Sequence, residues 1–489
     1  MSLDAQILAQ CEREQLHLSG AIQPHGTLLV ADAAGSITHA AQNIEAYLGS
    51  PASAWLGQAL PAPLATFAQS LAAVVGSRRW TVLVPTPNAQ PMQVLLTRGA
   101  NAQLIAELVL LPPGDAGGAA DAPQVHGRKT PKTREEMAAD EASITEQVAA
   151  LTHFQRVMYY RFREDGDGEV IAEARRGDSY GSYLGLRFPA SDIPQVARQL
   201  YLKNPWRMIP NAAAAPVPVL GNVPEAADLT YSDLRSISPV HQIYLGNMGV
   251  VASLSFPVVM RGALVGLVAA HHSQVQSLSF AVLEQCSQLV SRHAQTAVSY
   301  DLQQTLRRQD TITRRVEQLR PFVTSREDVQ QNWDVIGRQL ITMFDADGVR
   351  LCFDDAQLEH GLCGSASDRA PLEEWFVNDA DASVKNSDNI RRFVARPMSE
   401  SIAGVLGIDA SGRAGPLRVY LSRREHIHEV AWGGNPDKPM EAMGGPLPIA
   451  PRRSFEKWVE KRFGYCRPWN AEERHMALAL RVLLLHELR

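Results

Sequence analysis

The chain has 489 residues, of which 45% are hydrophobic and 20% are charged, a balance typical of globular domains that bury cores. Because one domain takes about 150 residues, this length predicts about three domains. The net charge of −5 excludes the strongly basic surface of a nucleic-acid binder. No apolar run reaches the roughly 20 residues of a membrane span, and the N-terminus lacks the pattern of a signal peptide, so we expect no membrane association and a cytoplasmic protein.

The first predicted unit is a small α+β domain. From Gly26 to Leu111, short alternating segments such as TLLVAD and AELVLLPP predict strands, and two helical segments interrupt them. The stretch from Pro112 to Lys132 is rich in Gly, Ala, Pro and charge and has no periodicity. It therefore predicts a linker.

A second α+β unit follows, with a helix from about Glu135 and strands at RVMYYRF, GEVIAEAR, SLSFPVVM and GALVGLVAAHH. From Ser277 nearly to Arg320, apolar residues at i+3 and i+4 steps predict one long helix that bridges two domains. Its apolar stripe suits packing on a second copy of the chain. A third mixed unit ends the chain, and its Pro/Gly-rich insertion from Gly433 to Arg453 is too long for an ordinary connection.

The five cysteines are odd in number and lack C-x-x-C spacing, which argues against a disulfide framework and against a metal site; they lie at 11, 286, 352, 363 and 466. Cys11 has polar neighbours on both sides, which favours an accessible thiol. Such a thiol could be a redox sensor, a nucleophile or an attachment point, and only its thiolate would react. The local sequence leaves these three roles open.

The stretch FPASDIP places Asp192 between two prolines that stiffen the backbone. On these residues alone, a helix start with Ser191 or Asp192 as N-cap is the simplest interpretation, and a rigid ligand cradle is the alternative. Arg198, Tyr201 and Arg207 follow in what we predict to be the same helix.

Further polar and aromatic residues follow in the second unit. A single histidine is more often structural than a ligand. Together, however, these side chains would suit a large planar ligand that carries carboxylates. The set comprises Tyr160, Tyr183, Phe188, Arg235, Ser238, His241, Tyr244, Ser253, Ser255, His271 and His272.

Five phrases together resemble the bacterial phytochromes: CEREQLHLSGAIQPHG, LGLRFPASDIP, RSISPVHQIYLGNMGV, EVAWGGNPDKP and PRRSFEKW. The resemblance covers almost the whole chain. It implies an α+β fold of three domains, each a central antiparallel sheet with flanking helices: PAS (1–125), GAF (126–305) and PHY (306–489). A long helical spine would link them, with a figure-of-eight knot at the N-terminus and a tongue at 430–458 extending from the PHY domain.

The resemblance implies a red/far-red photoreceptor that carries biliverdin. The position of Cys11 matches the family's cysteine that forms a thioether with the A-ring vinyl group. Plant-type members attach their bilin next to the histidine that matches His241, and that position is Val240 here. Light would rotate the D-ring about its methine double bond.

The resemblance also implies residue roles. Asp192 and His241 would organise the hydrogen bonds of the pyrrole N–H groups, and His271 would bind the D-ring carbonyl. The predicted chromophore-binding residues are Met158, Tyr160, Tyr183, Phe188, Asp192, Ile193, Pro194, Tyr201, Arg207, Arg235, Ser238, His241, Tyr244, Ser253, Ser255 and His271. Among them, Arg207, Arg235, Ser253 and Ser255 would hold the propionates, and the residues around the D-ring would be Tyr160, Phe188 and Tyr244, with Met158 and Tyr183 nearby.

In the implied tongue, Arg452 would pair with Asp192, and the segment would exchange strand for helix as the chromophore switches. The spine would then carry the signal to an output domain that we expect to be absent from this chain. The predicted signalling residues of the tongue are Trp432, Gly433, Gly434, Pro451, Arg452, Ser454 and Phe455. A homodimer through the long helices is expected, parallel or antiparallel.

Two alternatives stay open. The terminal HELR resembles the start of a histidine-kinase phosphoacceptor motif, but no nucleotide-binding glycine motif occurs in the chain, so we expect a sensor and not an enzyme. GAF domains also hold haem or cyclic nucleotides, and fold alone does not decide. Only a covalent bilin would require Cys11. Neither the ground state, conventional or bathy, nor the output domain can be read from these residues.

Overall fold

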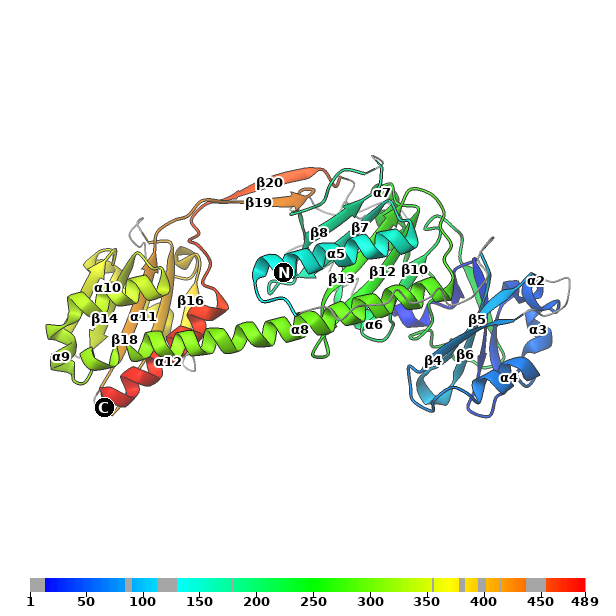
Figure 1. The fold of residues 1–489 in the computed structure, drawn as a ribbon, viewed down its shortest axis with the longest axis horizontal. Coiled ribbons are helices and arrows are strands. Elements are labelled where there is room, and N and C mark those ends of the chain that lie inside the picture. The colour runs from blue at the N-terminus through cyan, green and yellow to red at the C-terminus, as the bar shows by residue number, and fades with distance from the viewer. Residues whose placement is uncertain are drawn as a thin grey trace. The chain divides into compact units, whose positions relative to one another are not determined.

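The computed structural model describes residues 14–83, 90–112, 130–177, 180–353, 356–377, 383–394, 402–413, 415–436 and 454–488. The chain divides into two compact units (Figure 1). The first comprises residues 1–300 and 431–458, and the second comprises residues 301–430 and 459–489. Among the described residues, no helix is long and apolar enough to cross a membrane.

The first unit holds two sheets. The N-terminal sheet has seven strands in the order β1-β11-β3-β2-β6-β5-β4, and every neighbouring pair is antiparallel. Its strands are β1 (Ala21–Ile22), β2 (Gly26–Ala31), β3 (Ile37–Ala41), β4 (Arg78–Leu83), β5 (Met92–Arg98), β6 (Leu104–Leu110) and β11 (Val217–Gly221). The helices α2 (Glu45–Leu48), α3 (Ala52–Trp55) and α4 (Ala62–Ala68) share one core with it.

One strand of this sheet, β11, comes from far along the chain, and the N-terminal segment runs beside the same distant region. Leu229 N donates to His17 O (2.9 Å) and Ser236 N donates to Ala21 O (3.0 Å). Ile22 forms a bridge with Arg235. Residues 17–22 therefore contact residues 229–236 of the predicted GAF domain. The resemblance predicted a figure-of-eight knot at this end of the chain.

The second sheet has eight strands in the order β10-β12-β13-β7-β8-β9-β19-β20, and its last two strands extend beyond the residue limits of the first unit. Their bounds are β7 (Arg156–Phe162), β8 (Gly168–Arg175), β9 (Arg187–Phe188), β10 (Arg207–Ile209), β12 (Ala252–Met260), β13 (Ala263–His272), β19 (His428–Gly433) and β20 (Lys457–Arg462). The pairs from β10 through β9 are antiparallel, and β19 joins β9 by one parallel bridge between Trp432 and Arg187.

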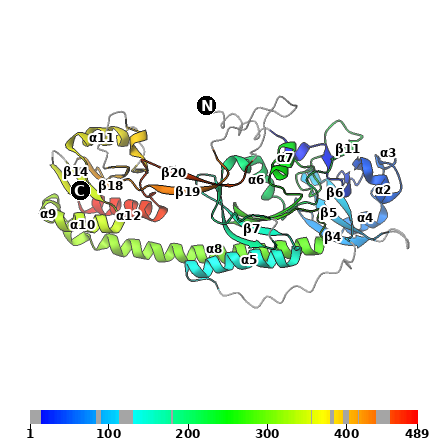
Figure 2. The same cartoon turned by 90° about the horizontal axis from the view of Figure 1, so that it is seen from above.

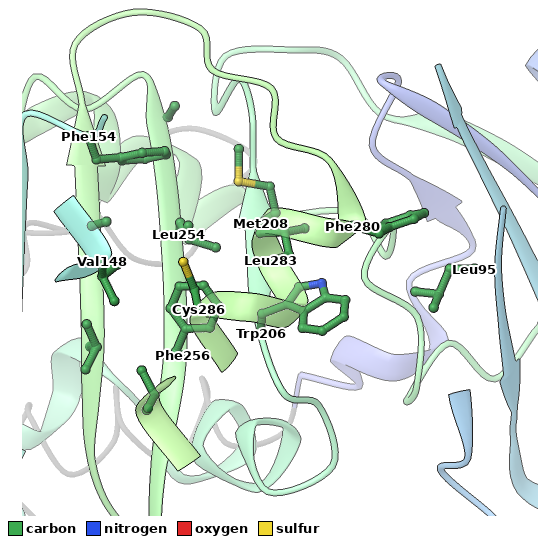
Figure 3. Packing of buried hydrophobic residues seen from close by; sticks show 14 of the residues in the cluster. Leu95, Val148, Phe154, Trp206, Met208, Leu254, Phe256, Phe280, Leu283 and Cys286 are labelled. Atoms are coloured by element: carbon green, nitrogen blue, oxygen red, sulfur yellow. The ribbon is translucent and has the colours of Figure 1, made fainter. Parts of the chain in front are cut away.

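Two helices, α5 (Arg134–Thr152) and the first part of α8 (Phe280–Glu317), lie side by side over one face of this sheet (Figure 1, Figure 2). The strands alternate, so every second residue faces these helices. Figure 3 shows the resulting core, in which Leu254 and Phe256 of β12 pack near Leu283 and Cys286 of α8. The long helix is thus confirmed close to its predicted limits. The other face of the sheet is left for the site, beside α6 (Gln195–Tyr201) and α7 (Pro239–Asn247).

The second unit has a five-stranded antiparallel sheet in the order β15-β14-β18-β17-β16. Its strands are β14 (Gly348–Phe353), β15 (Ala356–Gly361), β16 (Val384–Ser387), β17 (Gly404–Asp409) and β18 (Leu417–Arg423). Its helices are α9 (Arg326–Gln331), α10 (Trp333–Phe344), α11 (Arg369–Val377) and α12 (Ala471–Glu487). The sheet, α10 and α12 share one apolar core.

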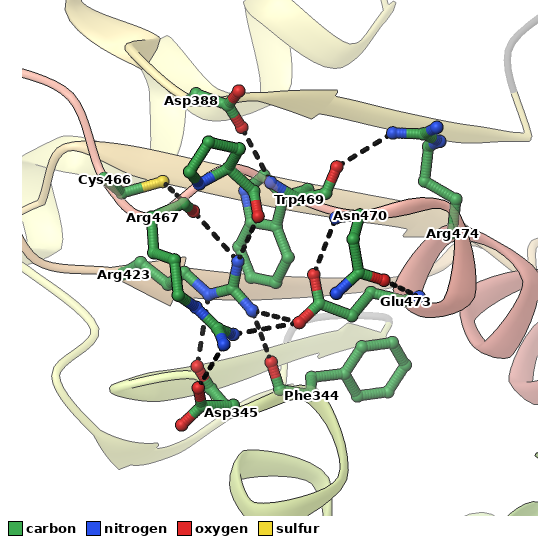
Figure 4. Close-up of polar contacts among 11 residues, drawn as sticks. Phe344, Asp345, Asp388, Arg423, Cys466, Arg467, Trp469, Asn470, Glu473 and Arg474 are labelled. Atoms are coloured by element: carbon green, nitrogen blue, oxygen red, sulfur yellow. Dashed lines mark hydrogen bonds and ion pairs between the residues drawn. The ribbon is translucent and has the colours of Figure 1, made fainter. Parts of the chain in front are cut away.

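A buried arginine ties this unit together. Arg423, only 2% exposed, ends β18 and donates to Phe344 O at the end of α10 (2.7 Å), and it pairs with Glu473 in the first turn of α12 (Figure 4). Its guanidinium also lies 3.6 Å from the centroid of the Trp469 ring. One side chain therefore joins two helices and a strand.

We expect Arg423→Met to lower the free energy of unfolding of this unit by about 3 kcal/mol, because it leaves the buried Glu473 without its main cation. Arg424→Met is the matched control, since the neighbouring Arg424 side chain is 68% exposed where it pairs with Asp347. Its loss should cost at most about 1 kcal/mol. Urea denaturation followed by tryptophan fluorescence measures the free energy of unfolding of both variants. Equal losses of stability would contradict the role of Arg423 as the residue that joins α10, β18 and α12.

Candidate functional site

The free face of the eight-stranded sheet encloses a cavity of about 270 Å³ in the first unit. Its walls come from β7, β12 and β13, from the segment around β9 and α6, from α7 and from the N-terminal residues Glu14 and Leu16. All sixteen side chains predicted to hold a chromophore line this cavity: Met158, Tyr160, Tyr183, Phe188, Asp192, Ile193, Pro194, Tyr201, Arg207, Arg235, Ser238, His241, Tyr244, Ser253, Ser255 and His271.

The strand register explains how distant residues meet here. Arg207 on β10 pairs with Ser255 on β12, which pairs with Ala269 on β13, which pairs with Met158 on β7. Residues directly opposite in an antiparallel ladder point to the same face. These four therefore form one row across the cavity floor. A parallel row two residues away contains Ser253 and His271.

Two arginines mark one end of the cavity. Arg207 donates to the backbone carbonyls of Asp233, Arg235 and Ser236. Arg235 is 7% exposed, and its guanidinium makes one hydrogen bond to the described residues, to Leu229 O at 3.2 Å. Burial first, and then the charge of Arg207, lower the pKa of Arg235 to about 9. A buried cation with spare donors fits an anionic ligand group.

The N-terminal sheet supports this end of the cavity from behind. Glu107 on β6, 1% exposed, accepts from Ser232 Oγ (2.6 Å) and from Leu234 N (2.7 Å). Gln23 donates to Met208 O and Asp233 O, both at 3.0 Å. Burial raises the pKa of both Glu107 and Asp233. The first domain therefore fixes the loop that carries Arg235.

Aromatic side chains form the opposite end. Tyr160 and Phe188 lie 6.1 Å apart, and Tyr183 lies 5.4 Å from Phe188, as ring centroids. Gly168 on β8 is required beside them, because a Cβ there would lie 1.8 Å from Cζ of Tyr160. Larger residues at this position would displace the tyrosine ring.

Between the two ends, Asp192 accepts a hydrogen bond from the Tyr244 hydroxyl at 2.8 Å. Tyr244 stacks on His241, with 6.0 Å between ring centroids and 13° between planes. Burial first, and then Arg207, lower the pKa of His241 to about 4. His241 is therefore neutral near pH 7 in the ligand-free chain.

Two local predictions about this region were wrong. The helix α6 begins at Gln195 with Pro194 as its N-cap residue, and neither Ser191 nor Asp192 caps it. Asp192 lies in a 3-10 turn before it, so its carboxylate stays available to Tyr244. Arg207 is the first residue of β10 and not part of a helix, because α6 ends at Tyr201.

Of the predicted tongue residues, five are described. Gly433 lies against Phe188, where a Cβ would come within 2.5 Å of the ring, and Gly434 N donates to Glu456 O (2.9 Å). Ser454 Oγ accepts from Glu456 N at 3.4 Å. Phe455 packs edge-on against Tyr244, with centroids 5.1 Å apart, and Trp432 bridges β9. Pro451 and Arg452 lie outside the described residues.

Cys11 also lies outside the described residues, but Glu14, three residues later, is placed. Its carboxylate accepts a hydrogen bond from Ser238 Oγ at 3.0 Å, at the start of α7. Glu14 and Leu16 both line the cavity and are therefore part of its wall.

Sequence reasoning missed part of the lining. One face of α6 contributes Val196, Ala197 and Leu200, and the i, i+1, i+4 spacing could have identified that face. Trp206 also lines the cavity, one residue before Arg207. No local signal identified Glu107, since its contacts are with residues more than 120 positions away.

Three family models match the chain: the PAS fold at residues 11–109, the GAF domain at 142–294 and the phytochrome region at 313–489. A bacteriophytochrome of Pseudomonas aeruginosa is 31% identical over 98% of this chain, and cyanobacterial phytochrome B of a Nostoc species is 29% identical over 98%. The chain belongs to the phytochrome family of photoreceptors. It is a PAS-GAF-PHY photosensory core that spans 66% of the length of each of these two relatives.

Solved phytochrome structures agree with this assignment. A bacteriophytochrome from R. palustris superposes with a TM-score of 0.78 at 25% identity, covering 98% of this chain and 99% of that one. The photosensory core module of the Stigmatella aurantiaca phytochrome gives a TM-score of 0.76 at 29% identity, with 97% of each chain covered. The predicted three-domain α+β fold with a helical spine is thereby confirmed.

Membership of the phytochrome family implies a bound linear tetrapyrrole, and the cavity of this phytochrome core fits one. Arg207 and Arg235 lie at one end, where two carboxylates would need cations. Neutral His241 and the carboxylate of Asp192 supply polar contacts in the middle, and the aromatic end suits an apolar ring.

The low pKa of His241 predicts a pH-dependent stability. The unfolded chain takes up a proton near the ordinary pKa of 6.5, whereas the folded chain takes it up only near 4. The contribution of His241 to stability is therefore complete above pH 6.5 and falls by about 1.4 kcal/mol per pH unit as the pH drops toward 4. His25 and His271 also have pKa values below 6.5, so the stability of His241→Gln should still fall in denaturant titrations of the ligand-free chain, but less steeply than that of the wild type by about 1.4 kcal/mol per pH unit. Parallel pH profiles would contradict this prediction.

Proposed function

We propose that this phytochrome core is a red/far-red receptor that binds biliverdin covalently through Cys11 and photoconverts between red- and far-red-absorbing states. The observation that carries the proposal is the single cavity that collects all sixteen predicted side chains in a cationic, a polar and an aromatic region. The bound bilin supplies the light absorption and the D-ring isomerisation. The chain's residues bind it, orient it and respond to it.

The cationic end would hold the propionates. Arg235 has guanidinium donors beyond the one that binds Leu229 O, and Ser253 and Ser255 line the same cavity. Carboxylates bound there would replace the water they lose with charge-assisted hydrogen bonds. They would also raise the pKa of Arg235 back toward its ordinary value, which couples ligand binding to stability.

The middle of the cavity would keep the pyrrole nitrogens protonated. Asp192 and His241 would accept and relay hydrogen bonds there, with Ile193 and Pro194 fixing the backbone. Arg198 stiffens this segment by donating to Ile193 O (2.8 Å) and Gly166 O (2.7 Å). A binding segment whose backbone is held so rigidly suits a ligand that must keep the same charge in both light states.

The aromatic end would surround the ring that moves. Tyr160, Phe188 and Tyr244 would contact it, with Met158 and Tyr183 beside them and His271 at its carbonyl. Met158, Tyr160 and Phe188 belong to one buried cluster that also contains Phe455 of the predicted tongue, and Tyr183 and Tyr244 pack against it. A change at this end would therefore reach the tongue through direct packing, as the first step of signalling.

The placement of Glu14 supports attachment at Cys11. Three residues span at most about 11 Å, so the chain between Glu14 and position 11 is short enough to allow attachment of a ligand in the cavity that Glu14 lines. Attachment would add the thiol across a vinyl double bond: sulfur bonds one carbon, the thiol proton goes to the other, and no oxidant is consumed. The described cysteines Cys286, Cys352, Cys363 and Cys466 are buried, and burial raises the pKa of each.

We further propose that a tongue at 430–458 exchanges its contacts as Arg452 leaves or meets Asp192, and that α8 carries the change toward an output domain. The domain limits at 125 and 305, a homodimer through the long helices and a purely sensory, non-enzymatic role belong to the same proposal. The position of α8 between the chromophore site and an output domain does not by itself demonstrate coupling between them, so the proposed contact of Arg452 needs its own test.

A haem or cyclic-nucleotide sensor is the second candidate, because GAF domains also hold such ligands. Neither ligand would need the thiol of Cys11. The sensor part of a histidine kinase would differ from this proposal only in its output activity. A phosphotransfer assay on a longer protein would test that activity.

Cys11→Ser should abolish covalent attachment when the chain is co-expressed with haem oxygenase. We expect wild type and the control Cys363→Ser to give a protein band with zinc-induced fluorescence on a denaturing gel, and Cys11→Ser to give none. Absorption spectra after red and far-red light report photoconversion and identify the ground state. A fluorescent Cys11→Ser band would show that another residue attaches the bilin.

Arg452→Ala should change the rate of dark reversion by about tenfold, the effect of losing one charge-assisted pair with Asp192. Arg453→Ala is the matched control, since it removes an adjacent arginine with the same charge. The decay of the photoproduct band after a light pulse measures both. If the two variants show the same rate of dark reversion, the proposed pair between Arg452 and Asp192 is wrong.

A further inference from the structure

Arg156, the first residue of β7, is a buried cation that has no anionic partner among the described residues. It is 1% exposed, and no carboxylate forms an ion pair with it within the described part of the chain. Its guanidinium instead stacks over two tyrosine rings, 3.8 Å from the centroid of Tyr183 and 4.5 Å from that of Tyr180. Burying a cation without an anion lowers the stability of the fold. The hydrogen bonds of Arg156 therefore point to a role other than stability.

One of those hydrogen bonds goes to the cavity. Nη2 of Arg156 lies 3.0 Å from Nδ1 of His271, its direct partner across the β7–β13 ladder. Nη1 donates to Gly181 O at 3.3 Å, and Nε finds no partner among the described residues. His271 lines the cavity and is 8% exposed.

The chemistry of the two groups determines where the proton lies. A guanidinium has only N–H donors and stays protonated at any ordinary pH. A nitrogen at hydrogen-bond distance from it must therefore accept, so Nδ1 of His271 carries no proton. An imidazolium, with N–H groups at both nitrogens, would set two donors against each other. Burial first, and then Arg156, also lower the pKa of His271 well below its ordinary value of 6.5.

We propose that Arg156 holds His271 as the neutral tautomer with its proton on Nε2, so that the ring donates a hydrogen bond to the ligand in the cavity. Nε2 makes no hydrogen bond to the described residues, which leaves it for that ligand. Arg156 is then a positioning residue that acts through His271. The inference rests on the proposed function only for the identity of the acceptor, a carbonyl oxygen of the bilin.

This tautomer determines which ligand atom can bind at His271. A donor at Nε2 selects a ligand atom with lone pairs, such as a lactam oxygen, and disfavours an N–H group at the same place. It also means that Tyr180 and Tyr183 matter for the ligand, because the guanidinium packs over both rings and is thereby held against Nδ1.

The test is 15N NMR of histidine-labelled protein, with and without biliverdin, in which His271 is assigned by the signal lost in His271→Gln. Couplings from the ring protons identify the nitrogen that carries the proton. We expect Nε2–H in wild type and in the matched control Arg175→Gln, which removes the arginine directly opposite Arg156 in the β7–β8 ladder. In Arg156→Leu, the preference for Nε2–H should fall by about tenfold or more, the factor that a charge-assisted hydrogen bond supplies.

A proton on Nδ1 in wild type overturns the proposal, and so does an unchanged Nε2–H preference in folded Arg156→Leu. If Arg156→Leu does not fold, Arg156→Lys replaces it: a lysine is also only a donor, so Nε2–H must persist, and a shift of the proton to Nδ1 counts against the inference. The ligand-free samples separate this result from the proposed function, whose failure would appear as a missing bilin absorption band while the tautomer remained measurable.

Discussion

The alternation of side chains along β7, β12 and β13 is the constraint on which the rest of the first unit depends. One set of residues, including Val157, Leu254 and Val268, is buried against α5 and α8, and the intervening set faces the cavity. A slip of one residue in any strand would move its apolar set into the cavity and its polar set into the core. The packing of α8 therefore fixes the register that brings Ser253, Ser255 and His271 together.

The cavity is cationic because a second sheet stands behind it. Glu107 on β6 holds the loop that carries Arg235, and Gln23 holds the carbonyls of Met208 and Asp233. These buried polar groups form hydrogen bonds across two domains, so removing either domain would leave polar groups of the other without these partners. This explains why the N-terminal domain and the cavity form one compact unit, and why a ligand with carboxylates would stabilise both.

The resemblance to the bacterial phytochromes predicted much of the site. Every predicted chromophore residue lines the cavity, because the motifs that contain them are contiguous and each places two or three such side chains. The errors were local. Asp192 suggested an N-cap, but the proline after Ile193 starts the helix later, and Arg207 follows a helix too short to include it. The role of Arg156 was missed because its strand gave no sign that a charged residue would be buried.

By itself, the sequence determined the elements and the chemistry available to them: the strand of Tyr160, the long helix after Ser277, and the presence of arginines, histidines and a lone early cysteine. Local periodicity and residue type suffice for these, since they depend on neighbours within a few positions. The tertiary structure alone decided which groups meet. Glu107 binds Leu234 N across 127 positions, and Arg156 binds His271 across 115. Only a folded sheet brings such groups within hydrogen-bond distance, and only burial makes their protonation states matter.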